Sequence, residues 1–62
     1  MYPSVTVSQA QAVRFSNGGA LSLDRLGDQA VADVTRVYDP ESTFLGLGTP
    51  TEGELRVLRL FG

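Results

Sequence analysis

The spacing of hydrophobic and polar positions changes several times along the chain, and each change marks an expected element. Residues 2–7 alternate and predict a short strand, whose first part Pro3 confines to a sheet edge. Residues 20–23 alternate in the same way and predict a second short strand. Residues 24–33 have a weak pattern, which is typical of a loop with room for one helical turn.

The clearest helix signal covers residues 8–18. Ser8 is a favourable N-cap residue, and Gln11 three positions later completes a capping box. Residues 17–19 (Asn-Gly-Gly) end the helix, because Asn and Gly readily adopt the left-handed conformation there. Two to three turns are too short to be stable alone, so this helix must pack on the domain. The expected inward face comprises Ala10, Ala12, Val13 and Phe15.

The second half of the chain is rich in strand patterns. Residues 34–38 predict a strand, residues 39–42 a type I turn, and residues 43–47 the returning strand. Residues 49–53 predict the next turn, and residues 54–61 the last strand. Gly46 and Gly48 interrupt the returning strand, and glycine within a strand marks a bulge, a sharp bend or a close approach of two backbones.

The last strand indicates how the sheet is closed. Alternate residues share one of its faces: Glu54, Arg56, Leu58 and Leu60. This face changes from polar to apolar along its length, which predicts that the strand leaves solvent and enters a barrel. The expected fold class is therefore mainly β, a small pseudo-barrel of about five strands with one or two short helices, because closure removes exposed sheet edges.

Composition limits the chemistry. With 62 residues the chain has one domain at most, and it contains no Cys, His or Trp, so disulfides, a Ser-His-Asp triad and a Cys nucleophile are excluded. No catalytic constellation, metal site or cofactor site is expected. Asp39 and Glu41 could pair around a hard cation, but their position is more typical of a solvated turn. Gly46 and Gly48 lack the third glycine and following helix of a dinucleotide loop.

The charge argues against a general nucleic-acid binder but leaves room for a local basic patch. Seven acidic residues oppose five arginines and no lysine, and the net charge is −2. No apolar run approaches the length of a membrane span, and no signal peptide is visible.

Two arginine-containing features are candidate sites. Residues 14–19 place Arg14, small polar side chains and glycine backbone at a helix end, where amide groups and arginine together can hold phosphate. Arg56 and Arg59 lie near Phe61, and arginine beside an aromatic ring can bind an RNA end. The structural alternatives are a plain helix stop and surface arginines paired with Glu52 or Glu54. Arg36 is a third, uncertain candidate, and Arg25 is expected to be a solvated loop residue.

Most of the chain resembles the C-terminal domain of the bacterial tRNA pseudouridine synthase B (TruB) family. Residues 14–21 (Arg-Phe-Ser-Asn-Gly-Gly-Ala-Leu) look like its helix-to-glycine-loop segment. Residues 34–40, 43–48 and 53–61 are similar to its closing hairpin and last strand, with Phe-Leu-Gly-Leu-Gly the most specific phrase. Residues 2–5 (Tyr-Pro-Ser-Val) resemble the join after the catalytic domain.

The resemblance implies a single PUA-type RNA-binding domain over residues 1–62, expected to be the C-terminal fragment of a larger cytoplasmic enzyme. Such an accessory domain helps to position tRNA on its acceptor-stem side, while the catalytic domain makes pseudouridine in the T loop. The catalytic Asp belongs to that upstream domain, so this chain itself is expected to be non-enzymatic. The implied partners are tRNA and the catalytic domain, with no membrane and no DNA.

Carried over residue by residue, the family's RNA surface predicts these contacts: Arg14, Ser16, Asn17, Gly18, Gly19, Arg56 and Arg59. The short chain, its acidic charge and its lack of lysine predict weak, salt-sensitive binding of tRNA in isolation. Two alternatives stay open. The domain could dock on the catalytic domain and stabilise it without binding RNA, marked by an outward apolar patch at Tyr2, Phe44 or Phe61. It could also be an unrelated small barrel that binds a protein or peptide.

Overall fold

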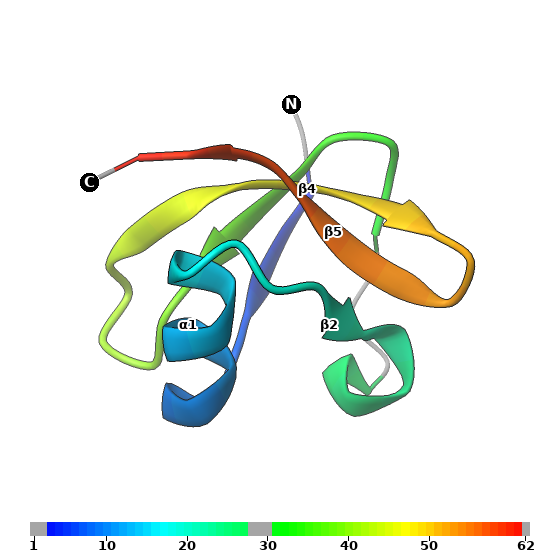
Figure 1. Ribbon diagram of the computed structural model, residues 1–62. Coiled ribbons are helices and arrows are strands. Elements are labelled where there is room, and N and C mark those ends of the chain that lie inside the picture. The colour runs from blue at the N-terminus through cyan, green and yellow to red at the C-terminus, as the bar shows by residue number, and fades with distance from the viewer. Residues whose placement is uncertain (1–2, 28–30, 62) are drawn as a thin grey trace.

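The computed structural model describes residues 3–27 and 31–61, which form a curled five-stranded sheet with one helix against its inner side (Figure 1). The elements in chain order are β1 (Ser4–Thr6), α1 (Gln9–Ser16), β2 (Leu21–Ser22), the 3-10 helix η1 (Leu23–Leu26), β3 (Thr35–Tyr38), β4 (Phe44–Thr51) and β5 (Glu54–Leu60). The strand order is β1-β3-β4-β5-β2, with β1 parallel to β3 and the other pairs antiparallel. The prediction of a small, mainly β pseudo-barrel is confirmed.

Helix α1 begins as its capping signal predicts. The Gln11 backbone N–H donates to the Ser8 hydroxyl at 3.2 Å, and the Ser8 N–H donates to the Gln11 side-chain oxygen at 2.8 Å. The buried face is narrower than predicted, because only Ala12 and Phe15 are buried. Ala10 is exposed, and Val13 is 54% exposed. The cap defines the start of the helix, but neighbouring strands decide how much of its surface they cover.

Replacing Ser8 with alanine is expected to lower the free energy of unfolding by about 1 kcal/mol, because the Gln11 amide in the first turn loses the hydroxyl that accepts its hydrogen bond. Urea unfolding followed by circular dichroism measures the change. Ser4→Ala is the matched control, since Ser4 is an exposed strand residue. Equal losses in the two variants would mean that the cap contributes no specific stability.

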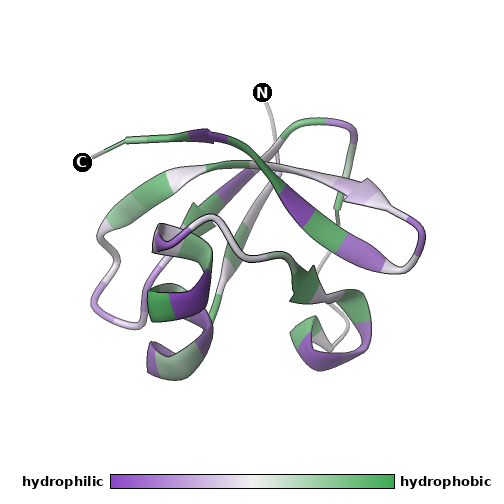
Figure 2. Cartoon of the chain, in the orientation of Figure 1, coloured by the Kyte–Doolittle hydropathy of each residue, from purple (hydrophilic) through white to green (hydrophobic). Residues whose placement is uncertain are grey.

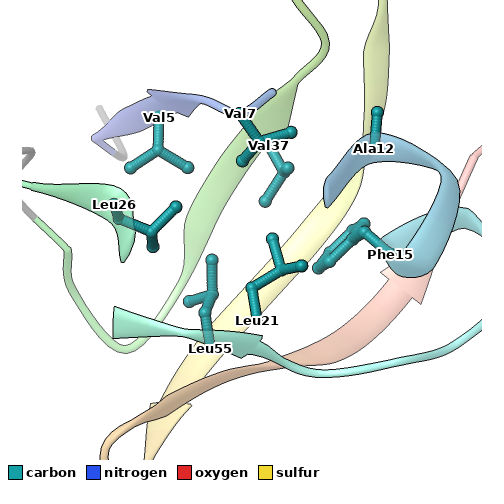
Figure 3. Packing of buried hydrophobic residues seen from close by; sticks show 8 residues of the cluster. All are labelled: Val5, Val7, Ala12, Phe15, Leu21, Leu26, Val37 and Leu55. Carbon is teal, nitrogen blue, oxygen red and sulfur yellow. The ribbon is translucent and has the colours of Figure 1, made fainter. Parts of the chain in front are cut away.

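The hydrophobic core lies between α1 and the inner face of the sheet (Figure 3). Its buried residues come from every element except β4 and from the segment before α1: Val5, Val7, Ala12, Phe15, Leu21, Leu26, Val37 and Leu55. The buried hydroxyl of Thr35 donates to the Ala32 carbonyl at 2.8 Å and accepts from its amide at 3.0 Å. This polar group is therefore satisfied by a local loop contact.

The hairpin between β4 and β5 is tighter than predicted. The expected turn over residues 49–53 is wrong, because β4 continues through Pro50 to Thr51. The turn consists of Glu52 and Gly53, whose φ angles of 51° and 82° suit a two-residue connection. Pro50 is tolerated because β3 pairs with β4 only as far as Gly48, so the missing N–H leaves no partner in β3 unpaired.

The interpretation of the strand glycines is confirmed. The ladder between β4 and β5 shifts register between Leu47 and Gly48. A Cβ atom at Gly46 would overlap the backbone carbonyl oxygen of Arg59, and one at Gly48 would lie 2.8 Å from Cγ of Leu55. These two positions allow β5 to cross β4 closely.

The prediction that the last strand enters the barrel through Leu58 and Leu60 is wrong. These side chains are 53% and 42% exposed. Val57 pairs with Gly48 and Arg59 with Leu47, so Leu58 is an extra residue in the ladder. The bulge interrupts the alternation along β5. Hydrophobic colour accordingly continues to the outer ends of β4 and β5 beside the C-terminus (Figure 2).

The remaining predictions of secondary structure agree with the structure where residues are described. The 20–23 strand is present as β2, and the helical turn is η1, whereas residues 28–30 lie outside the described part. The Ser42 amide donates to the Asp39 carbonyl at 3.0 Å, which forms the predicted turn. The Asp39 carboxylate accepts from the amides of Glu41 and Thr43 at 2.9 and 2.8 Å, so its role is to hold the turn. No helix within residues 3–27 and 31–61 has the length and apolar character needed to cross a membrane.

Candidate nucleic-acid interface

The backbone amides at the end of α1 are already engaged. The amide of Gly18 donates to the Phe15 carbonyl at 3.0 Å, and that of Gly19 donates to the Arg14 carbonyl at 2.9 Å. The amide of Asn17 also donates into the last turn. These bonds end the helix with Gly18 at a φ of 87°. The amides therefore do not supply the phosphate contact that the sequence suggested, and only side chains of this segment are available for a ligand.

Arg14 is positioned by the glycine loop that follows it. Its Nε donates to the Ala20 carbonyl at 2.7 Å, which folds the side chain over the loop. A Cβ atom at Gly19 would lie 2.7 Å from Cγ of Arg14, so glycine is needed for this arrangement. The terminal guanidinium nitrogens have no hydrogen bond or ion pair with any residue that the structure describes. Arg14 thus presents an oriented and unneutralised charge at the surface.

Arg14 lies in a groove of about 340 Å³ between α1, β2, η1 and the start of β5. Its lining is Ala10, Gln11, Arg14, Ala20, Leu21, Ser22, Arg25 and Glu54. The side-chain amide of Gln11 lies 3.5 Å from the Arg25 carbonyl and links the two walls. Arg56 follows Glu54 by two residues on β5 and is exposed, but it is not one of the residues that line the groove.

Arg25 is the residue whose importance the sequence did not reveal. Its neighbours along the chain predict a loop, and nothing local places it opposite Arg14. Only the pairing of β2 with β5 and the turn of η1 bring it to the groove. The resulting pair of arginines shares the groove with one carboxylate, Glu54.

Ser16 faces a different hollow from Arg14. Residues two apart on a helix do not share a face, so α1 directs Arg14 and Ser16 of the 14–19 motif to different sides of the helix. The second hollow has a volume of about 470 Å³ at one end of the barrel and is lined by Ser16, Thr43, Phe44, Leu45, Leu60 and Phe61. Asn17 borders a shallower depression of about 270 Å³ next to it.

Arg59 lies on the outer face of the sheet. Its guanidinium carbon is 5.3 Å from the centroid of the Phe61 ring. Arg56 and Arg59 are exposed, and neither forms an ion pair with Glu52 or Glu54. The structural alternative of paired surface charges is therefore not observed. The structure brings Arg14 together with Arg25, and Ser16 together with Phe61, but it does not gather all the predicted residues into one site.

A comparison of the sequence with protein-family models identifies the family of the chain. Residues 3–61 match the model described as the C-terminal domain of pseudouridine synthase II TruB. The chain belongs to this family. This match confirms, over nearly the whole chain, the resemblance that the sequence motifs indicated. It identifies the chain as an accessory domain of a pseudouridine synthase, which is an isomerase that acts on tRNA. No relative among the curated proteins matches the chain.

Proposed function

We propose that this TruB C-terminal domain binds tRNA through the groove between α1, β2 and η1. In that role it is a single PUA-like unit of a larger enzyme and helps to hold tRNA on its acceptor-stem side. The catalytic domain then modifies the T loop. The observation that carries the proposal is Arg14, whose side chain is fixed by Ala20 while its terminal nitrogens stay free.

The chemistry of the groove suits the sugar-phosphate backbone. Arg14 and Arg25 offer planar donor groups from opposite walls. Arg56 is exposed two residues after Glu54 on β5 and adds positive charge to that strand. Glu54 is the one carboxylate among the lining residues, and it opposes phosphate close to its own side chain. Gly18 and Gly19 allow the RNA to approach the helix end closely, where Ser16 and Asn17 offer a hydroxyl and an amide. Few phosphate contacts predict weak binding.

Titration of the domain with a blunt-ended acceptor-stem hairpin, whose two strands are joined by a non-nucleotide linker so that it contains no unpaired base, tests this site. We expect amide NMR shifts to cluster at residues 14–25 and 54–56. Binding is expected to weaken steeply with salt, since each phosphate contact contributes a slope of about −0.9 in log K against log salt concentration. Arg14→Gln and Arg25→Gln should each reduce the magnitude of that slope by about 1.

Arg59→Gln is the matched control, because it removes the same charge from the outer face of the sheet, away from the groove. It should leave hairpin binding unchanged. The two groove variants also serve as checks on each other. The Arg14 side chain has a structural hydrogen bond, whereas the Arg25 side chain has none with residues 3–27 or 31–61. Diffuse shifts, or equal effects of all three variants, would contradict an RNA site in the groove.

One observation favours docking on the catalytic domain as a second candidate function. Phe61 is 43% exposed and Phe44 is half-buried, so part of the outward apolar patch expected for docking is present. Tyr2, the third residue of that expected patch, lies outside the described residues. Val13 and Leu60 add exposed aliphatic surface at the same end of the barrel. Such patches mark interfaces. Absence of any hairpin-induced shift, together with binding to a separately added catalytic domain, would favour docking alone.

A further inference from the structure

Three of the four aromatic rings in the described part of the chain form a row on the outside of the sheet. Tyr38 and Phe44 have ring centroids 5.4 Å apart at an interplanar angle of 49°. Phe44 and Phe61 are 5.1 Å apart at 39°. The fourth ring, Phe15, is in the core. Tyr38, Phe44 and Phe61, here called the aromatic row, thus lie side by side in tilted contact outside the hydrophobic core.

Positive charge lies along the same face. Strand register places Arg36 of β3 opposite Leu47 of β4, and Leu47 opposite Arg59 of β5. Directly paired residues point to the same side of a sheet, so the two arginines flank Leu47. Arg59 is over Phe61, and the Nε atom of Arg36 is buried without a hydrogen-bond partner in the described structure. Neither arginine is neutralised by a described acid.

The hollow of about 470 Å³ opens beside the row. Phe44 and Phe61 form part of its wall, Leu45 and Leu60 contribute aliphatic surface, and Ser16 with Thr43 supplies hydroxyl groups. A site that is mostly apolar with a few polar groups suits a flat ligand with a polar edge. A nucleobase has this character, since every base has an apolar face and hydrogen-bonding groups on its edge.

The nearest acidic groups are on the turn after β3. One carboxylate oxygen of Asp39 accepts from two backbone amides, and Glu41 is exposed. These two carboxylates repel phosphate from the turn, so the favourable position for phosphate is the part of the aromatic row that lies next to Arg59. An anionic and aromatic ligand is therefore complementary to this surface in both charge and shape.

We propose that the aromatic row and the adjoining hollow bind an unpaired nucleotide of RNA. The base stacks against Phe61 within the hollow, and its phosphate contacts Arg59. This inference rests on the proposed RNA-binding function, but it concerns a second site, separated from the groove by α1. It adds recognition of single-stranded RNA to phosphate binding in the groove.

Titration with a single-stranded pentanucleotide, oligoadenylate, tests the second site. Phe61→Leu keeps an apolar side chain but removes the ring, and is expected to weaken oligoadenylate binding about tenfold. Phe61→Tyr keeps the ring and should retain binding. Amide shifts should cluster at residues 44–45 and 59–61. Arg14→Gln is the comparison variant: it should weaken hairpin binding more than oligonucleotide binding, and the oligonucleotide-induced shifts at residues 44–45 and 59–61 should persist in it.

The outcomes separate the two proposals. Hairpin binding without oligoadenylate binding overturns the aromatic-row site and leaves the groove intact. Unchanged oligoadenylate affinity in Phe61→Leu also overturns it. If neither RNA binds, the proposed function fails as well. A result in which Phe61→Leu weakens only association with a separately added catalytic domain would assign the row to a protein interface instead. Circular dichroism confirms that each variant is folded.

Discussion

Replacing Phe15 with alanine is expected to unfold most of the protein at room temperature. Phe15 lies on the inward face of α1 and is fully buried in the core (Figure 3). Truncation of a buried phenylalanine to alanine costs about 3–5 kcal/mol, because apolar contacts are lost and a cavity remains. A core of this size rarely supplies more than about 3–5 kcal/mol in total, and the chain contains no cysteine for a disulfide. The loss is therefore comparable to the whole stability.

Phe61→Ala is the matched control for this experiment. It removes the same atoms from a side chain that is 43% exposed, so the expected loss is below about 1 kcal/mol. Urea unfolding followed by circular dichroism compares the two variants with the parent chain. If Phe15→Ala retained nearly full stability, α1 would not be anchored through this residue, and the positions of Arg14 and Ser16 would need another explanation.

The elements that the sequence predicted correctly depend on short-range signals. Ser8 and Gln11 form their cap within one helical turn, and Gly18 ends the helix through bonds to carbonyls a few residues earlier. The turn after β3 is likewise held by Asp39 and its immediate neighbours. In each case the interacting groups are close in sequence, so residue type and spacing contain most of the information.

The errors occur where distant strands decide the outcome. Leu58 and Leu60 look like barrel residues until the ladder with β4 introduces a bulge. Pro50 looks like a turn residue because the sequence does not show that β3 stops short of it. The division of the candidate site has the same origin. Arg25 reaches the groove through tertiary pairing. The amides of Gly18 and Gly19 donate to carbonyls in the last turn of α1, because these glycines form the helix end that the sequence predicted.

Replacing Gly46 with alanine is expected to be about as destructive as the loss of Phe15, although it adds only one methyl group. The new Cβ atom would overlap the carbonyl oxygen of Arg59 and lie 3.0 Å from Cα of Leu60. Both neighbours are backbone atoms of β5, so they can move only if the two strands separate. Ordinary overpacking costs about 1–3 kcal/mol. We expect a loss at or above the upper end of this range, measured by urea unfolding.

Two other glycines show whether the cause is the close approach of the strands. A Cβ at Gly53 would have no atom within 4 Å, and asparagine tolerates its φ of 82°, so Gly53→Asn should lose about 1 kcal/mol or less. Gly48→Ala should be intermediate, since its nearest contact is the Leu55 side chain, which can move in part. Equal stability of Gly46→Ala and Gly53→Asn would contradict the observed crossing of β4 and β5.

Because the clash at Gly46 involves Arg59 and Leu60 themselves, any Gly46→Ala protein that stays folded should also show shifted amide signals along residues 59–61. The same small residue would then account for both the stability of the hairpin and the geometry of the proposed nucleotide site.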